Sequence, residues 1–128
     1  MARKNGIIIL VLVVLMIIFG AVMVLKDDKE RFPSGKDTVE SFGDGTFQIL
    51  RGYVDNKQVD SLFNYNLDIL EQVVEKNIKN YKVKDRMLYV LGDEGYTRVN
   101  IQTYEVKKAK SLVDFNREDA KIFENIKQ

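Results

Sequence analysis

The stretch YKVKDRMLYVLGDEGYTRVNIQTYEV, residues 81–106, decides the fold class. Short runs rich in β-branched and aromatic residues alternate in it with polar or glycine-containing turns. These runs occupy 81–83, 87–91 and 96–101. Strands joined by turns of about two to four residues pair with their sequence neighbours in antiparallel fashion. The stretch, which ends with a further turn before Val106, therefore predicts an antiparallel meander.

The residues before this stretch carry a similar strand pattern. In TFQILR, residues 46–51, the apolar side chains of Phe47 and Ile49 fall on one face of an expected strand. Residues 55–57, DNK, look like a hairpin tip that leads into a second strand at 59–63. We therefore expect a β-hairpin ahead of the meander.

Residues 66–77 allow two interpretations. Leu67, Leu70 and Val74 recur at the spacing of three or four that is typical of an amphipathic helix, and Asn66 suits the N-cap position. We therefore predict a short helix here. A pair of strands is the alternative, because the β-branched residues of this stretch also suit a sheet.

The end of the chain predicts a second helix. Asn116 suits an N-cap, and the acidic residues that follow it suit the first turn of a helix. This helix of about ten residues carries a narrow apolar stripe for docking on the sheet, formed by Ile122, Phe123 and Ile126. The fold class expected for 39–128 is α+β, with an antiparallel sheet of four to six strands, a short middle helix and a docked C-terminal helix.

An apolar run occupies Ile7 to Leu25, nineteen residues without a charge or a proline. At a rise of 1.5 Å per residue it spans about 28 Å, close to the hydrocarbon thickness of a bilayer. We expect one N-terminal transmembrane helix, retained as a signal anchor. The alternative, a cleaved secretory signal, is disfavoured because the apolar core is too long and no A-x-A-like cleavage site follows it.

The flanking charges indicate an orientation. Arg3 and Lys4 precede the run, and Lys26, Lys29 and Arg31 follow it, so the positive-inside rule alone is nearly balanced. The very short N-terminal tail favours a cytoplasmic N-terminus. The predicted organisation is a cytoplasmic N-terminus (1–6), a transmembrane helix (7–25), a charged linker (26–38) and an extracytoplasmic β-rich domain (39–128).

Composition excludes several kinds of site. The chain has no Cys and no His, so it has no disulfide, no thiolate metal site and no Ser-His-Asp or Cys-His catalytic arrangement. In residues 26–128, 18 basic and 19 acidic side chains nearly balance, so we expect no nucleic-acid binding. We assign no catalytic, cofactor-binding or metal-binding residue, and we expect that the protein is not an enzyme.

Three acidic residues in glycine-rich turns are the remaining candidates for chemistry: Asp44, Asp93 and Glu94. The turns, GDG at 43–45 and GDEG at 92–95, favour such residues for backbone reasons. They match neither the P-loop nor the dinucleotide-binding glycine pattern. A calcium site at Asp93 and Glu94 is the alternative, but the spaced ligands of a calcium loop are missing. We therefore interpret all three as turn residues.

Two further groups of side chains are candidate contact surfaces. The basic residues, which either touch anionic headgroups or form a solvated face, are Lys76, Lys79, Lys82, Lys84, Arg86, Lys107, Lys108 and Lys110. The aromatic residues, which mark a binding patch only if they are exposed together, are Phe47, Tyr53, Phe63, Tyr65, Tyr81, Tyr89, Tyr96 and Tyr104. We favour the solvated face for the first group and the core for several members of the second. Tyr89 and Tyr96 flank one turn and predict a cross-strand pair.

Two segments resemble known proteins. Tyr89 to Val106 resembles one blade of a β-propeller, although the chain is too short for a closed propeller. The part from Gly43 to Gln128 is similar to a group of uncharacterised short membrane-anchored proteins of Gram-positive bacteria, with the pattern Asp-Gly-x-Phe/Tyr-Gln-Ile, Tyr-x-Val and Gly-Tyr-x-x-Ile-Asn. The matching residues are 44–49, 81–83 and 95–100. This resemblance implies membrane anchoring and brings no known activity.

These features predict a single-pass membrane protein whose outer domain binds another protein, for example as an accessory subunit of a membrane complex. The alternative is an immunity-type self-protection protein against a toxin or bacteriocin. An enzyme that uses carboxylates, and a structural role for the apolar helix itself, are further alternatives. The expected partners are the lipid bilayer, through residues 7–25, and an unidentified protein.

Overall fold

The structure is a computed structural model that describes residues 10–15 and 30–127. Residues 10–15 are helical and belong to the predicted transmembrane segment. The predicted cytoplasmic segment 1–6, the rest of the 7–25 segment and the start of the predicted linker lie outside the described residues. Within the described ranges, no helix combines the length and the apolar character that a membrane span requires.

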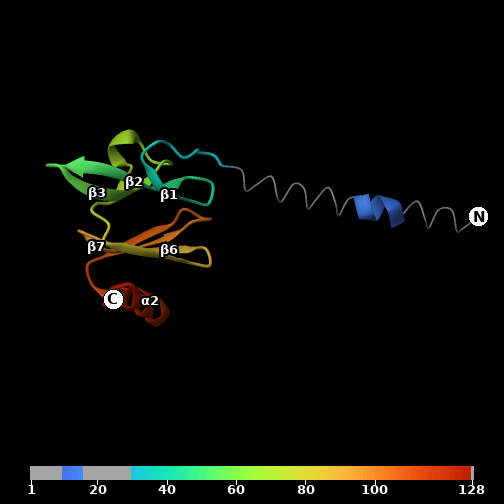
Figure 1. The fold of residues 1–128 in the computed structure, drawn as a ribbon. Helices are drawn as coiled ribbons and strands as arrows, with labels where there is room; N and C mark the ends of the chain where they lie inside the picture. The colour runs from blue at the N-terminus through green and yellow to red at the C-terminus, as the bar shows by residue number, and fades with distance from the viewer. Residues whose placement is uncertain (1–9, 16–29, 128) are drawn as a thin grey trace, which may run out of the picture.

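Two antiparallel sheets form the domain, and in each sheet the strands pair with their neighbours in the sequence (Figure 1). The N-terminal sheet contains β1 (Thr38–Phe42), β2 (Phe47–Val54), β3 (Lys57–Asn64) and β4 (Val73–Glu75). The C-terminal sheet contains β5 (Asn80–Lys84), β6 (Met87–Gly92), β7 (Gly95–Asn100) and β8 (Val106–Ala109). The predicted α+β class and antiparallel pairing are confirmed. The predicted single sheet is wrong, because the strands divide between two sheets.

The two sheets pack face to face, and side-chain alternation along the strands explains why. Phe47 and Ile49 of β2 point toward the C-terminal sheet, and Leu88 and Val90 of β6 point back. The buried residues of this contact are Phe42, Phe47, Ile49, Leu62, Val74, Leu88, Val90 and Val99. Because full burial of one such side chain contributes about 1.5–3 kcal/mol, this contact supplies most of the stabilising burial.

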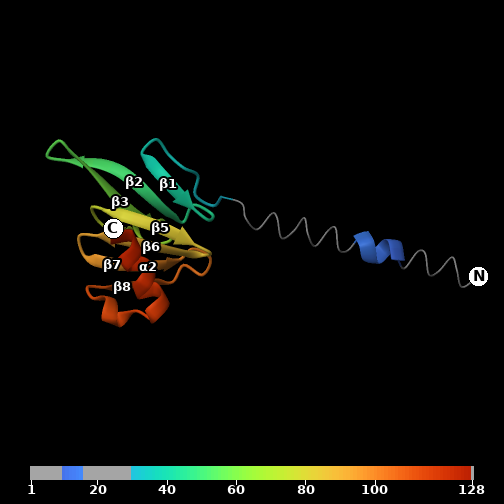
Figure 2. The ribbon, with the colours of Figure 1, turned by 60° about the horizontal axis from the view of Figure 1, so that its bottom comes forward.

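Helix α2 (Arg117–Lys127) covers the other face of the C-terminal sheet, as the sequence predicts (Figure 2). The backbone N–H of Asp119 donates to the side-chain oxygen of Asn116 at 2.8 Å, which confirms the predicted N-cap. A single 3-10 turn, η2 (Leu112–Asp114), precedes the helix. Figure 1 shows the resulting layers: the N-terminal sheet, the C-terminal sheet and α2.

The predicted cross-strand pair of Tyr89 and Tyr96 is wrong. The turn between β6 and β7 has only two residues, so the register pairs Tyr96 with Leu91 and Tyr89 with Arg98. The two tyrosines meet instead through Phe123 of α2, whose ring centroid lies 5.3 Å from that of Tyr89 and 5.2 Å from that of Tyr96. Both tyrosines therefore help to dock the helix.

The predicted helix at 66–77 is also wrong. The chain forms one 3-10 turn, η1 (Ile69–Glu71), and then strand β4. The helical spacing of Leu67 and Leu70 produces no buried stripe, because both side chains are exposed. Pairing with β3 places the side chain of Val74 in the core. The alternative prediction, a pair of strands, is therefore correct for one short strand, β4.

Residues 31–37, within the predicted linker, lie against the N-terminal sheet, and we call them the strap. The backbone N–H groups of Arg31 and Phe32 donate to the carbonyl oxygen of Asp44 at 2.7 and 3.1 Å. The ring of Phe32 stacks on that of Tyr65, with the centroids 5.7 Å apart. The packed part of the domain therefore begins at Arg31, and β1 follows the strap directly.

Phe123→Ala is expected to destabilise the domain by about 3–5 kcal/mol, because it leaves a cavity between α2 and the C-terminal sheet. Val113 in η2 is 88% exposed, so Val113→Ala is a control whose effect stays within about 0.5 kcal/mol. Urea denaturation of the full-length protein in detergent measures both changes. A loss below about 1 kcal/mol for Phe123→Ala contradicts the docking of α2.

Candidate functional site

Asp44, one of the acidic candidates, joins the two sheets. Its carboxylate accepts hydrogen bonds from the backbone N–H and the hydroxyl of Thr46, at 3.0 and 2.6 Å, and from the hydroxyl of Tyr104 in the loop before β8. Burial alone raises the pKa of Asp44, but these hydrogen bonds and the charge of Arg31 hold the pKa below its usual value. The carboxylate therefore accepts hydrogen bonds that hold the two sheets together.

Asp93 and Glu94 lie in the β6–β7 turn and take part in separate contacts. The side-chain amide of Asn77 donates to Asp93 at 3.0 Å, and Glu94 forms an ion pair with Lys108. The hydrogen bond from Lys108 and its charge hold the pKa of Glu94 below its usual value. In the part of the chain that the structure describes, no three Asp, Glu, His or Cys side chains converge to hold a metal ion.

Glu75 at the end of β4 is a buried carboxylate that the sequence analysis missed. It is 1% exposed, and it accepts hydrogen bonds from the backbone N–H groups of Lys76 and Glu94 at 3.0 and 3.1 Å. The hydroxyl of Thr97 lies 3.4 Å away, and the absence of a side chain at Gly92 leaves the space that Glu75 occupies. Glu94 and Thr97 belong to the β6–β7 turn and to β7, so Glu75 also joins the two sheets.

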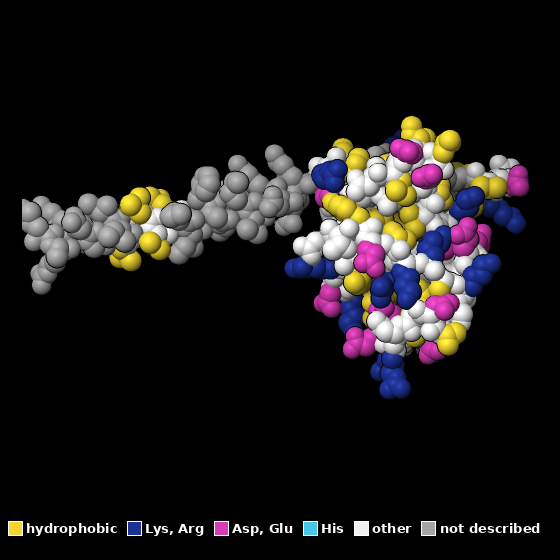
Figure 3. Space-filling model, turned by 180° about the vertical axis from the view of Figure 1, so that it is seen from behind, with side chains coloured by type: hydrophobic (Ala, Val, Ile, Leu, Met, Phe, Trp, Pro, Cys, Tyr) yellow, Lys and Arg dark blue, Asp and Glu magenta, His cyan; other side chains and the backbone are white. Residues whose placement is uncertain are grey.

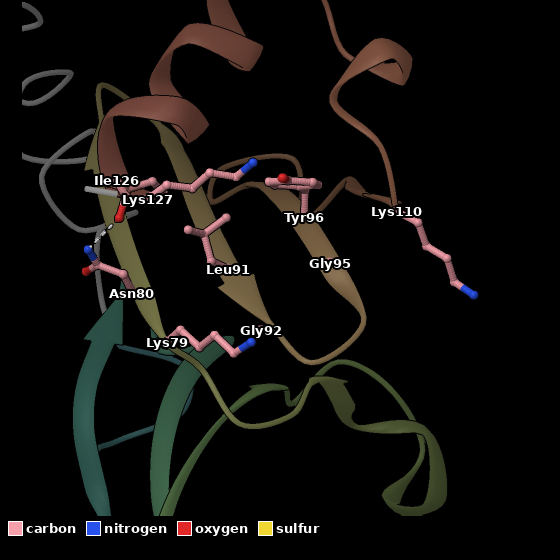
Figure 4. Close-up of a pocket in the computed structure, with 9 residues that line it drawn as sticks. All are labelled: Lys79, Asn80, Leu91, Gly92, Gly95, Tyr96, Lys110, Ile126 and Lys127. Atoms are coloured by element: carbon pink, nitrogen blue, oxygen red, sulfur yellow. Dashed lines mark hydrogen bonds between the residues drawn. The ribbon is translucent and has the colours of Figure 1, made fainter.

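A pocket of about 510 Å³ beside the end of α2 brings together two of the predicted basic residues (Figure 4). Lys79 and Lys110 line it with Lys127, whose amine lies 4.9 Å from the ring centroid of Tyr96. Figure 4 shows Lys110 pointing away from the other two lysines. Exposed amines that do not converge attract anions in general and select none, so we do not assign this pocket a ligand.

The other predicted basic residues occupy separate positions. Lys82, Lys84 and Arg86 are exposed on β5 and in the turn after it. The amine of Lys107 lies 5.1 Å from the ring centroid of Phe115, and Lys108 pairs with an acid in the β6–β7 turn. The exposed positions of Lys82, Lys84 and Arg86 agree with a solvated face, whereas Lys107 and Lys108 make contacts within the domain.

The eight aromatic candidates do not form one patch. Seven are buried or half-buried, namely Phe47, Phe63, Tyr65, Tyr81, Tyr89, Tyr96 and Tyr104. The hydroxyl of Tyr89 donates to Asp119 at 2.8 Å, and burial together with this hydrogen bond raises the pKa of Tyr89 to about 12. The interpretation of several aromatics as core is confirmed, because Phe47 and Tyr89 are core residues and Tyr81, Tyr96 and Tyr104 pack against the core. Tyr53 is 71% exposed.

The outer half of the β2–β3 hairpin extends beyond the rest of the N-terminal sheet. β1 pairs with β2 only as far as Leu50, and β4 pairs with β3 only from Leu62. Residues 52–59, which we call the ribbon, therefore pair only with each other among the described strands. Tyr53 and Val54 on the ribbon are 71% and 59% exposed. The ribbon projects from the sheet at the left of Figure 1.

The ribbon is ordered at its tip and at its base. Asp55 and Asn56 have φ angles of 51° and 64°, which form a two-residue type I′ turn and confirm the predicted hairpin tip. At the base, the guanidinium of Arg51 lies 3.2 Å from the carboxylate of Asp60. The backbone N–H of Arg51 also donates to the carbonyl oxygen of Asp37 in the strap at 2.8 Å. The ribbon is thus a defined two-stranded arm.

The loop between β3 and β4 presents apolar side chains to solvent. Leu67, Ile69 and Leu70, here called the apolar loop, are 42%, 85% and 98% exposed. The N–H of Asn64 donates to the carbonyl of Gln72 at 2.8 Å, and the Gln72 amide donates to the carbonyl of Leu67 at 3.1 Å, which closes the loop. Hydrophobic side chains reach the surface along the top of the domain in Figure 3, the side on which this loop lies in Figure 1.

No family model, curated protein or solved structure matched the chain when it was compared with known proteins. The ribbon and the apolar loop are the two surfaces that the geometry singles out. The register of the hairpin places them at opposite ends of the N-terminal sheet, because Phe47 pairs with Asn64 at the loop end and Val54 pairs with Lys57 at the ribbon tip.

The environment of Asp44 predicts a sensitivity to acid. Because its folded pKa lies below the ordinary value of 3.8, the carboxylate stabilises the fold above that pH and loses its contribution as the pH falls through the folded pKa. Below about pH 4, we expect the free energy of unfolding to fall more steeply for the wild type than for Asp44→Asn. Denaturant titrations of the full-length protein across this pH range measure both, and parallel curves contradict the expectation.

Proposed function

We propose that this protein is a single-pass membrane protein whose C-terminal domain binds another protein at the outer face of the membrane, through the ribbon. The supporting observation is that neither edge of the ribbon pairs with another described strand. Unpaired edges present a row of backbone donors and acceptors, to which a strand of a partner can add. Tyr53 supplies an exposed aromatic side chain of the kind that is enriched at interfaces.

The ribbon also carries features that limit unspecific pairing. Asp55 and Lys57 place charges at its tip, and the Arg51–Asp60 ion pair stands at its base. Charges along an edge strand oppose aggregation between identical edges. A two-stranded ribbon without further strands is only marginally stable in water, so the addition of a partner's strand stabilises it.

Binding is favoured over catalysis because the carboxylates that sequence or structure singles out are already engaged. Asp44 and Glu75 join the two sheets, and Glu94 is paired with Lys108. Each of these carboxylates is held in place by hydrogen bonds or an ion pair within the domain. These contacts support the proposal that the domain acts through its surface.

Tyr53→Ala combined with Val54→Asp is expected to lower the recovery of a crosslinked partner on the order of tenfold, because it alters the exposed side chains of the ribbon. The full-length protein is crosslinked in the membranes of cells that make it, purified in detergent and quantified with its partner. Val113→Asp on the exposed η2 turn is the matched control and retains wild-type recovery.

Equal recovery from the ribbon variant and the control contradicts binding through the ribbon, provided that both variants unfold at the wild-type urea midpoint. The identity of the captured partner also distinguishes the two candidate functions. A membrane-complex subunit indicates an accessory protein, whereas a toxin or bacteriocin indicates immunity.

The proposed orientation is testable because the chain has no Cys. A cysteine at the ribbon tip, Asn56→Cys, is expected to react with a membrane-impermeant maleimide in intact cells. Ala2→Cys is the control for the predicted cytoplasmic end and reacts only after the cells are permeabilised. Protection of Asn56→Cys until permeabilisation reverses the orientation.

A further inference from the structure

We infer that the apolar loop rests in the surface of the lipid bilayer, so that the domain touches the membrane at a second point beside its anchor. The inference depends on the proposed anchoring through residues 7–25. It gives Leu67, Ile69 and Leu70 a lipid environment, and it orients the domain on the membrane.

The apolar loop holds its side chains in solvent although the chain around it is ordered. Leu70 and Ile69 are 98% and 85% exposed, whereas Val74, which follows in β4, is 8% exposed. Single exposed apolar residues are common on protein surfaces, but three within four positions form a patch. The hydrogen bonds between Asn64, Leu67 and Gln72 keep this patch from folding back.

The apolar loop lies at the end of the sheet where the described chain enters the domain. The backbone N–H of Tyr65 donates to the carbonyl oxygen of Thr46 at 2.7 Å, beside the turn that holds the strap. The ring of Tyr65 then stacks on Phe32 of the strap, 5.7 Å away. Leu67 follows Tyr65 by two residues, so the loop and the start of the strap are neighbours.

The length of the intervening chain keeps this end of the domain close to the bilayer. The apolar run ends at Leu25, and the first hydrogen-bonded residue of the strap is Arg31. Six residue steps reach at most about 20 Å, even for a fully extended chain. The apolar loop is therefore tethered within reach of the headgroup layer.

The chemistry of the loop favours lipid over a protein partner. Its exposed side chains are aliphatic, whereas the residues that dominate protein interfaces are Trp, Tyr and Arg. Aliphatic side chains enter the boundary between headgroups and acyl chains by apolar burial. Asp68 and Glu71 lie on the same loop, so the contact depends on apolar area and is expected in an uncharged bilayer.

This contact turns the ribbon away from the membrane. The ribbon tip at Val54 is seven strand positions from Phe47, about 23 Å along β2, and it lies at the end opposite to the apolar loop. With the loop end held at the lipid, the unpaired edges face the space where a second protein is accessible.

The test uses the absence of Trp from the chain. Leu70→Trp gives the full-length protein a single fluorescent reporter on the apolar loop, and Val113→Trp places a matched reporter on another exposed 3-10 turn. Both are reconstituted in vesicles of phosphatidylcholine, with and without brominated acyl chains as the quencher. We expect a blue-shifted emission and about twofold stronger quenching for Leu70→Trp than for Val113→Trp.

Co-flotation of the protein with the vesicles is measured in the same samples. If the protein floats but both reporters emit as in water and are quenched equally, the loop faces solvent or another protein and the inference is overturned. If the protein remains in the soluble fraction without detergent, the proposed anchoring fails, and the inference fails with it. Tyr53→Trp on the ribbon is expected to stay unquenched, and its quenching contradicts the inferred orientation.

Discussion

The packing of the two four-stranded sheets on each other is the contact on which the rest of the structure depends. Each meander has an apolar face that it cannot bury alone, and the shared core, from Phe42 to Val99 in the sequence, buries both of these faces. The C-terminal sheet is then covered on its second face by α2, while the strap crosses the outer face of the N-terminal sheet through Gln48 and Tyr65. The unpaired ribbon and the apolar loop both belong to the N-terminal sheet.

Polar groups reinforce this contact at its edges. Asp44 links the β1–β2 turn to Tyr104, and Glu75 links β4 to the β6–β7 turn. Asp44 is a candidate for chemistry in a sequence without His or Cys, but in the structure both acids accept hydrogen bonds that include a donor from the turns or loops of the C-terminal sheet. Two exposed features, the two-stranded arm and the aliphatic loop, lie at opposite ends of the N-terminal sheet. This arrangement supports a proposed binding protein that stands on a membrane and presents an edge to a partner.

Sequence patterns predicted the parts of the fold whose signals are local. The meander at 81–106 follows from alternation, and α2 follows from Asn116 and its apolar stripe. Strand β4 was missed because Leu67, Leu70 and Val74 fit a helical period, and only pairing with β3 decides against it. Alternation shows which residues share a face but not which sheet a strand joins, so the division into two sheets was not predictable. For the same reason, the exposure of Tyr53 and the burial of Glu75 depend on where neighbouring strands end.

Amide hydrogen exchange along β2 and β3 of the full-length protein, in detergent and without a partner, tests the central claim that the ribbon has free edges. Within each strand, we expect the exchange rate of the amides to change where the core part meets the ribbon. Amides of 47–50 and 62–64 exchange slowly with the core. The outward-facing amides of 52–59, which have no partner among the described strands, exchange rapidly without any opening of the sheet. Uniform slow exchange along both strands contradicts the account, because the ribbon edges are then already paired.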